Sequence, residues 1–396
     1  MNKGKITKSM QKLVRFRKAA YLPATETYSV LMNMRTDPEL PSYPPLWFVR
    51  ISQKIRLFFL RMNRRFTHPN FVMWELAQNM WLAAGISVVA ELGIADLVKE
   101  GPVSIKDLAD QTGTHEESLY RVMRMLASQG IFRELREQRF ESNFLAVPLQ
   151  EDQIRYLMLL HLNRNQFQIF GNLMKSVRTG KPVSEDLSAE ALFDRRENNE
   201  LKKEWFNRAM TNASKMQVPA LLSAFPFRKY EKIIDIGGGE GFFLANILRR
   251  RVKSRGVLFD LPGALSGAED IIDRFSLKGR MELVGGDFFE NVPASGNLYI
   301  LKSILHDWDD ESSMKILGKL HEVMGPKSRL LVIESVLDER NHPSFGKMAD
   351  ILMMAAAGGK ERTLKQWENL LSASGFSIRK IHPTITPHSI IEVLKI

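Results

Sequence analysis

One segment of the chain, IIDIGGGEGFFLANILRR at residues 233–250, restricts the possible folds more than any other. Its pattern predicts a short apolar strand, a glycine-rich turn and a helix. Glycines let a backbone turn sharply and approach a ligand without a Cβ clash. The N-terminus of the following helix offers free N–H groups to an anionic group. We therefore predict a ligand site at this turn, although a tight turn without a ligand would use the same glycines.

Strands and helices alternate from Tyr230 onward, which predicts a doubly wound, Rossmann-like α/β domain over residues 226–396. The predicted strands are KIIDIG, RGVLFDLP, MELVGGDFF, LYILKSIL and RLLVIESVL. Asp260 ends the second strand, where a carboxylate can accept hydrogen bonds from both hydroxyls of a ribose. The glycine spacing is G-x-G-x-G with Asp235 in front, unlike the G-x-G-x-x-G of dinucleotide enzymes. It favours a nucleoside cofactor with an amino-acid tail.

The basic N-terminal extension, residues 1–72, accounts for the whole net charge of +11, because it holds fourteen Lys and Arg against three acids. Helical periodicity predicts a helix from about Trp47 to Phe66. Its apolar arc consists of Trp47, Phe48, Ile51, Ile55, Phe58, Phe59, Met62 and Phe66. An amphipathic helix with flanking basic residues is typical of a peripheral membrane contact, here through residues 45–66. Packing on its own body or on a sister subunit would explain the same pattern.

Residues 73–150 predict a helical domain of the winged-helix type. Two helices, SIKDLADQTG and HEESLYRVMRMLASQGIF, precede a short hairpin, FRELREQRFES, and Ser104 and Asp107 form a capping pair. A winged helix raises the question of DNA binding, but Glu116 and Glu117 begin the second helix and it has no basic stripe. We therefore expect a dimerisation domain, a homodimer and no nucleic-acid partner. Residues 151–225 are expected to be a helical linker that contributes to the substrate pocket, with a polar connection at 178–205.

The segment LKSILHDWDD, residues 301–310, places His306 just past a predicted strand, at the edge where open α/β sheets bind ligands. A neutral imidazole can accept the proton of a phenol near neutral pH. Glu334 and Glu361 follow from later segments of the same edge and could orient the imidazole. A helix cap or a core histidine is the alternative interpretation.

The acids that follow the histidine, Asp307, Asp309 and Asp310, are interpreted as the N-terminal acids of the next helix. Adjacent His306 and Asp307 would not share a face, and no second histidine follows at i+4. We therefore predict no metal site.

Together, the motifs DIGGGEG, FDLP, GGDFF, LKSILHDWDD, VIES, GGKERT and the closing W-x-x-L-L-x-x-x-G-F resemble those of a known family. The chain is similar to class I S-adenosylmethionine-dependent O-methyltransferases over about residues 74–396. Within that class it looks like the cation-independent group of caffeate and hydroxyneurosporene O-methyltransferases, which carry a winged-helix dimerisation domain. The resemblance implies that His306 is the general base and that Glu334 and Glu361 flank it.

The resemblance also implies which residues hold S-adenosyl-L-methionine. They are Ser214, Asp235, Gly237, Gly238, Gly239, Gly241, Asp260, Leu261, Gly286, Asp287, Phe288 and Lys302. The substrate pocket is expected to use Phe206, Met210, Trp308, Met353 and Met354. The stretch MMAAAGG, residues 353–359, directly precedes Lys360 of the GGKERT motif. Its residues are small or apolar, whereas plant relatives have polar residues there. An apolar pocket and ordinary core packing of Met and Ala both explain it.

The sequence thus predicts an enzyme that transfers a methyl group from S-adenosylmethionine to a hydroxyl of a lipophilic or aromatic small molecule, such as a carotenoid or a bacteriochlorophyll precursor. Two alternatives are a hydroxylase or decarboxylase on the same fold, and a winged-helix DNA regulator that binds S-adenosylmethionine. Cysteine is absent, which suits a reducing compartment. We expect a cytoplasmic protein with a peripheral membrane contact.

Overall fold

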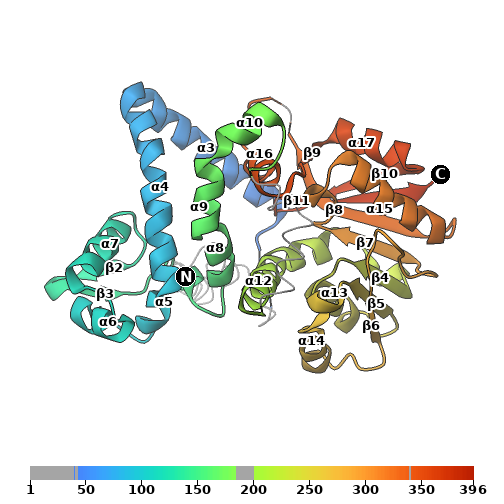
Figure 1. Cartoon of the computed structure of the whole chain (residues 1–396), viewed down its shortest axis with the longest axis horizontal. Helices are drawn as coiled ribbons and strands as arrows, with labels where there is room; N and C mark the ends of the chain where they lie inside the picture. Colours follow the sequence, from blue (N-terminus) through green and yellow to red (C-terminus); the bar gives the residue numbers. More distant parts are fainter. Residues whose placement is uncertain (1–39, 41–42, 184–199, 339) are drawn as a thin grey trace, which may run out of the picture. The chain divides into compact units, whose positions relative to one another are not determined.

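The computed structural model describes residues 40, 43–183, 200–338 and 340–396. Two compact units divide the chain, residues 1–167 and 168–396, and each has its own hydrophobic core (Figure 1). The basic start of the extension and most of the predicted polar connection lie outside the described residues. No helix in the described ranges is both long enough and apolar enough to cross a membrane.

Two long helices open the first unit. The helix α3, Leu46–Phe66, confirms the predicted amphipathic helix, and α4 spans Pro69–Glu91. The boundary expected at residue 72 therefore falls inside α4. A short helix, α5 at Ile94–Leu97, follows.

The helix α8, Arg155–His161, packs against α4 within this unit. Arg155 Nε donates to the carbonyl of Ala90 at 2.6 Å, and Ser87 Oγ donates to the carbonyl of Leu162 at 2.6 Å. These contacts place residues 155–162 with the first unit, although the sequence assigned them to the region that follows it.

The winged-helix region has the two predicted helices, α6 at Ile105–Thr112 and α7 at Glu116–Ser128. Ser104 Oγ accepts from the amide of Asp107 at 3.1 Å, which confirms the predicted cap. The sheet has one more strand than the predicted hairpin, in the order β1-β3-β2. Its strands are β1 Val103–Ser104, β2 Arg133–Leu135 and β3 Arg139–Glu141, and the short 3-10 turns are η1 Arg136–Gln138 and η2 Val147–Leu149.

The second unit is built on a mixed sheet with the strand order β10-β11-β8-β7-β4-β5-β6. The parallel strands are β4 Lys232–Ile236, β5 Arg255–Asp260, β6 Met281–Gly285, β7 Leu298–Lys302 and β8 Arg329–Leu337. The antiparallel hairpin β10 Phe376–Pro383 and β11 His388–Lys395 was not predicted, and β9, Arg362–Thr363, pairs with β8.

Helices cover both faces of this sheet (Figure 1). The helices α15 and α17 pack with Ile234, Tyr299 and Val332 in one core cluster, whereas α13 packs on β5 and α12 on β11. The helices described from residue 164 onward, not all of which pack on the sheet, are α9 Arg164–Gly171, α10 Leu173–Thr179, α12 Glu200–Ala224, α13 Phe242–Arg249, α14 Ala268–Arg274, α15 Asp310–Val323, α16 Phe345–Leu352 and α17 Leu364–Ala373. Shorter turns are η4 Phe227–Lys229, η5 Pro262–Leu265, η6 Leu305–Asp307 and the π-helix η7 Met353–Ala357. Because β4 to β8 are parallel, their carboxyl ends share one edge, where α/β proteins bind ligands.

Candidate active site

The strand order arranges the predicted site residues in a row along this edge. In the order β8-β7-β4-β5-β6, the strands contribute Glu334, Lys302, Asp235 and Asp260, and Asp287 follows the last strand. Glu334, which was predicted to flank the candidate base His306, therefore lies at one end of the row. The residues expected to hold the nucleoside lie at the other end.

The glycine turn after β4 has a backbone that side chains would disturb. Gly237, Gly239 and Gly241 have φ of +67°, +59° and +80°. A Cβ at Gly237 would clash with Ile304 Cδ1, and one at Gly241 would clash with Met281 Cε. A Cβ at Gly239 would meet no protein atom within 4 Å, so this glycine faces open space.

Asp260 fixes the turn from the neighbouring strand. Its Oδ2 accepts from the amide of Gly239 at 2.7 Å, and its Oδ1 accepts from the amide of Leu261 at 2.7 Å. Burial raises its pKa to about 6, and these two amide donors oppose the shift. The carbonyl of Asp260 accepts from the amide of Gly286 at 3.0 Å, which ties in the segment after β6. Each carboxylate oxygen keeps a lone pair that a ribose hydroxyl could use.

Two buried charges lie in the middle of the row. Asp235 is completely buried, and neither of its carboxylate oxygens has a hydrogen-bond partner among the described residues. Burial raises its pKa to about 7, while the positive charge of Lys302 opposes that shift. Burial also lowers the pKa of Lys302, against the charges of Asp235 and Glu334. A Cβ at Gly238 would crowd Asp235 Oδ2, so the turn lies directly against this carboxylate.

The helix α12 reaches the same turn through a contact that the sequence analysis missed. Thr211 Oγ1 donates to Glu240 Oε2 at 2.8 Å. Glu240 belongs to the GGGEG turn, and a Cβ at Gly267 would clash with its carboxylate. Ser214, one turn further along α12, is buried. The only sequence signal was an acid inside a glycine turn, with no indication of its partner.

Aromatic side chains line the segment after β6. Phe288 lies next to the glycine turn, because its Cε1 is 3.8 Å from a Cβ built on Gly237. Trp308 contacts Phe288 edge-on at 6.2 Å between ring centroids and Phe289 at 4.7 Å. Asp287 is exposed, and its Oδ1 accepts from the amide of Phe289 at 2.8 Å. Trp308, predicted for the substrate pocket, therefore packs on a residue predicted for the cofactor.

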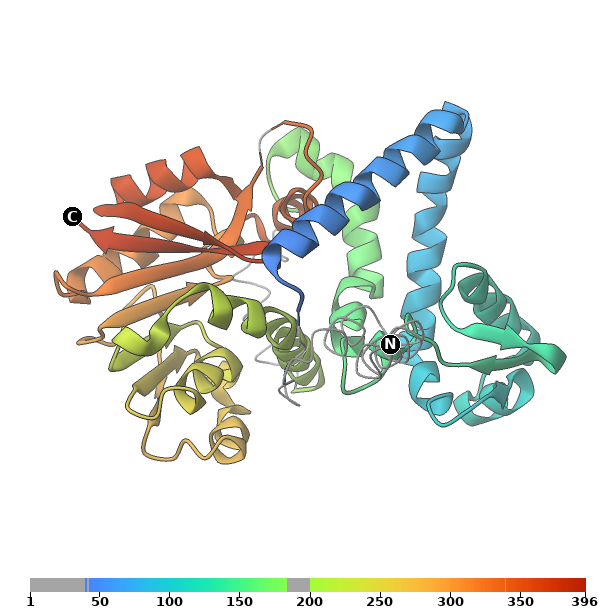
Figure 2. The same ribbon diagram turned by 180° about the vertical axis from the view of Figure 1, so that it is seen from behind.

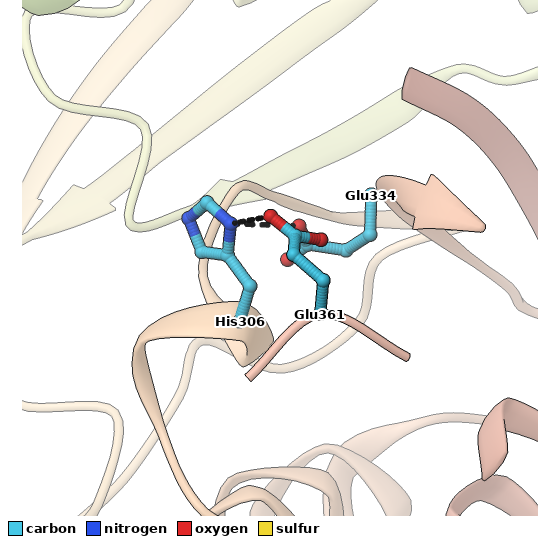
Figure 3. A group of neighbouring side chains, drawn as sticks. All are labelled: His306, Glu334 and Glu361. Atoms are coloured by element: carbon cyan, nitrogen blue, oxygen red, sulfur yellow. Dashed lines mark hydrogen bonds and ion pairs between the residues drawn. The ribbon is translucent and has the colours of Figure 1, made fainter. Parts of the chain in front are cut away.

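His306 lies in η6 with one ring nitrogen facing two carboxylates and the other pointing away from them (Figure 3). Its Nδ1 is 3.0 Å from Glu361 Oε1 and 3.6 Å from Glu334 Oε2. Its Nε2 is 3.7 Å from Asp307 Oδ1. The side chain of His306 is 16% exposed, whereas those of Glu334 and Glu361 are buried. Because Nδ1 faces the two carboxylates, Nε2 is the ring nitrogen that a substrate could use.

Glu334 also fixes the backbone that carries the histidine. Its Oε1 accepts from the amides of Ile304 and Leu305 at 2.9 and 3.0 Å. Its Oε2, like Oε2 of Glu361, is buried without a hydrogen-bond partner among the described residues. Such unpaired carboxylate oxygens favour a positive charge on the neighbouring ring.

These charges change the protonation of His306. Burial lowers its pKa, but the charges of Glu334 and Asp307 and the hydrogen bond with Glu361 outweigh burial and raise the pKa to about 10. Burial raises the pKa of Glu334 to about 7, opposed by His306. The surrounding carboxylates therefore favour the protonated, positively charged form of the imidazole.

His306, Glu334 and Glu361 could also hold a metal ion, because one ligand atom from each lies within 4.8 Å of the others. However, a separation of 3.0 Å between Nδ1 and Glu361 is that of an N–H···O hydrogen bond. Glu334 Oε1 is already committed to backbone amides. The geometry favours an oriented imidazole over a metal ligand.

Arg362, which the sequence analysis overlooked, joins the two segments that carry His306 and Glu361. It is fully buried. Its guanidinium donates to the carbonyls of Leu305 and Trp308 at 2.7 and 3.0 Å. It also donates to Ser313 Oγ and to Asp310. Its only sequence signal was a basic residue in GGKERT.

The interpretation of the three aspartates needs one correction. Asp309 is the N-cap of α15, its side chain accepting from the amide of Ser312 at 2.8 Å, and Asp310 begins this helix, as predicted. Asp307 instead belongs to η6, where it approaches His306. The prediction was wrong for this residue because a separate 3-10 turn precedes the helix.

A second contact missed from the sequence supports the turn between Lys302 and His306. Ser303 has φ of +56°, which is strained for a residue with a side chain. Its Oγ lies 3.2 Å from Nε2 of His388, a buried histidine from β11. Burial, together with the charges of His306 and Lys302, lowers the pKa of His388 to about 3, so it is neutral.

The remaining residues predicted for the substrate pocket are all half-buried. Phe206 and Met210 lie on α12, and Met353 and Met354 begin the π-helix η7. A π-helix is rare and often marks a functional site. Their shared pocket remains a prediction.

The parallel strands of the sheet, the glycine turn and the histidine that faces two glutamates are together typical of a transferase that uses a nucleoside cofactor. Comparison with known proteins identifies the family. Residues 170–377 match the O-methyltransferase domain and residues 74–149 match the O-methyltransferase dimerisation domain. The chain belongs to this family of S-adenosylmethionine-dependent O-methyltransferases.

Individual relatives agree with this assignment. A phenazine O-methyltransferase of Lysobacter antibioticus is 35% identical over 81% of this chain and 95% of its own. The crystal structure of LaPhzM has a TM-score of 0.79 and 34% identity, covering 83% of this chain and all of that one. NcsB1 from neocarzinostatin biosynthesis, solved with S-adenosylmethionine and 2-hydroxy-5-methyl naphthoic acid, has a TM-score of 0.70 and 27% identity, covering 80% of this chain and 96% of its own.

Gly239→Ala tests whether the open side of the turn is cofactor space. We expect affinity for S-adenosylhomocysteine, measured by calorimetry, to fall about tenfold or more, a loss of about 1.4 kcal/mol. Gly279→Ala is the matched control, because Gly279 has φ of +74° and a Cβ there would also meet nothing within 4 Å. Both variants should lose similar stability from backbone strain. Equal affinities would contradict the assignment of Gly239.

Arg362→Met should separate the two segments that carry His306 and Glu361. We expect the free energy of unfolding to fall by about 3 kcal/mol, because buried carbonyls lose their donor and Asp310 loses a buried partner. Methyl transfer should fall more than cofactor affinity. Lys360→Met is the control, because Lys360 also pairs with Asp310 but is partly exposed. It should cost less than about 1 kcal/mol. Denaturant unfolding of both variants measures these two losses in the free energy of unfolding. Equal losses would contradict the role given to Arg362.

Proposed function

We propose that this enzyme methylates a hydroxyl of an aromatic or lipophilic small molecule, with His306 as the general base. The arrangement of His306 Nδ1 against Glu361 and Glu334 supports this proposal most strongly, because it leaves Nε2 as the proton-accepting atom. Bound S-adenosylmethionine would supply an activated methyl group. The protein's remaining task is to position the hydroxyl and remove its proton.

The residues near His306 would divide this task. Nδ1–H would donate to Glu361, which orients the ring and fixes the tautomer. Nε2 would accept the proton of the substrate hydroxyl as the hydroxyl oxygen takes the methyl group. The bond between sulfur and the methyl carbon would break, with S-adenosylhomocysteine as the leaving group. The unpaired oxygens of Glu334 and Glu361 would stabilise the resulting imidazolium.

The cofactor residues would act along the same edge. Asp260 would accept hydrogen bonds from the ribose, and Asp235 would offer its two unpaired oxygens near the glycine turn. Asp287, Phe288 and Leu261 would hold the adenine end. This order follows the strand order β4-β5-β6.

An aromatic substrate is supported by the relatives and by the side chains near the site. The relatives named above act on a phenazine or bind a hydroxynaphthoic acid. Trp308 and half-buried Met210, Met353 and Met354 could supply an apolar wall. The dimerisation domain supports a homodimer as the working form.

His306→Ala tests the base. With a phenolic substrate, kcat/KM should fall by about 10²- to 10⁴-fold, the usual contribution of a general base. Affinity for S-adenosylhomocysteine should change little, because His306 is not assigned to the cofactor. His342→Ala is the control, since that histidine is exposed. Near wild-type turnover by the His306 variant would refute the base assignment.

Two further measurements on the wild-type enzyme test the type of reaction. Formation of S-adenosylhomocysteine distinguishes methyl transfer from hydroxylation or decarboxylation. Excess EDTA should leave the rate unchanged if no metal ion takes part.

The pH profile tests the carboxylates. Only unprotonated His306 can accept a proton, so kcat/KM should rise with pH toward the pKa of about 10. Glu361→Gln removes a negative charge that raises this pKa, so the rising limb should move to lower pH. The plateau rate should fall about tenfold or more, because the imidazole is less well oriented. Using one substrate for both enzymes keeps substrate ionisation constant. If the rising limb of the pH profile stays in place in Glu361→Gln, then Glu361 does not raise the pKa of His306.

A further inference from the structure

The helix α3, Leu46–Phe66, leaves its apolar arc in solvent. None of its residues is buried. Seven large apolar side chains of the arc are between 41 and 79% exposed: Trp47, Phe48, Ile51, Ile55, Phe58, Phe59 and Phe66. Contiguous apolar surface of this kind marks an interaction site.

The charge of α3 restricts what can cover this arc. The helix contains six cations and no acid: Arg50, Lys54, Arg56, Arg61, Arg64 and Arg65. At 100° per residue, Arg50, Lys54 and Arg61 fall together on one side of the arc. A partner that covers this arc must therefore present an apolar surface with negative charge beside it.

A phospholipid bilayer with anionic headgroups offers both. Nucleic acid would match the cations but leave the aromatic and aliphatic arc uncovered. A second copy that presented the same face would set these cations against one another. The helix also precedes the region that matches the dimerisation domain, which begins at residue 74.

We propose that α3 is a docking surface for an anionic lipid bilayer, on which it lies in the plane of the interface. At about 1.5 Å per residue the helix is long enough to reach across the apolar layer, but its six cations exclude a span. Instead the arc enters the boundary between headgroups and acyl chains, and the cations contact lipid phosphates. The corner with α4, at Thr67 and His68, lets α3 point away from the winged-helix region (Figure 2).

Vesicle sedimentation of the full chain tests this proposal. The protein should pellet with vesicles of phosphatidylcholine and phosphatidylglycerol and bind at least tenfold more weakly to phosphatidylcholine alone. Two variants should each lose at least tenfold in partitioning to the anionic vesicles. One replaces the cations, Arg50→Gln, Lys54→Gln and Arg61→Gln, and the other replaces the arc, Ile51→Ser, Ile55→Ser and Phe58→Ser.

A matched control keeps the test independent of net charge. The variant Lys99→Gln, Lys253→Gln and Lys327→Gln removes three exposed cations elsewhere and should bind within twofold of the wild type. Affinity for S-adenosylhomocysteine, measured on every variant, verifies the fold. Equal sedimentation of all variants would overturn the proposal. So would arc variants that bind vesicles normally but change the oligomeric state in light scattering, because a second copy would then cover the arc.

Trp47→Phe gives a more local test. Trp47 is 61% exposed and belongs to the arc. Binding should be unchanged because phenylalanine is also apolar, while quenching of tryptophan fluorescence by brominated lipids should decrease. Unchanged quenching would mean that this end of α3 does not enter the bilayer.

Discussion

The proposed catalytic segment depends on one buried guanidinium. Arg362 is completely buried, and burial of a charge is costly unless its donors are satisfied. Arg362 satisfies them with two carbonyls of the His306 turn, Ser313 and the carboxylate of Asp310. Its guanidinium also lies over the ring of Trp367 at 5.2 Å. Because these contacts fasten the two segments together, Glu361 is held 3.0 Å from the imidazole.

The same segments approach each other too closely for most side chains. A Cβ at Gly359 would overlap the carbonyl of His306, and the amide of Lys360 donates to that carbonyl at 3.0 Å. The GGKERT motif thus combines three tasks: close backbone approach, the buried cation and the carboxylate that contacts the ring. Its position next to the π-helix η7 connects this framework to the residues proposed for the substrate pocket.

Local signals in the sequence predicted most of the fold. The glycine turn, the cap at Ser104 and the amphipathic pattern of α3 each depend on neighbours in the chain, so they could be read directly. The residues of the site were predicted from their positions at the ends of predicted strands and from the resemblance to the methyltransferase family. The hairpin of β10 and β11 was missed, and the Thr211–Glu240 and Ser303–His388 contacts could not be derived. Each pair comes from segments far apart in sequence, and no feature of one segment indicates its partner in the other.

The electrostatics of the edge bear directly on the role proposed for His306. With a pKa near 10, only about one imidazole in a thousand would be unprotonated at pH 7. The negative charges that make the ring a strong base therefore also keep it protonated in the free enzyme. A sulfonium cofactor held along the same row would bring positive charge close to the ring and oppose this shift. Glu334 and Asp235, whose pKa values burial raises to about 7, are groups of the same row that could gain negative charge in response. In the proposed function, the charges along this edge would therefore link cofactor binding to the availability of the imidazole as a base.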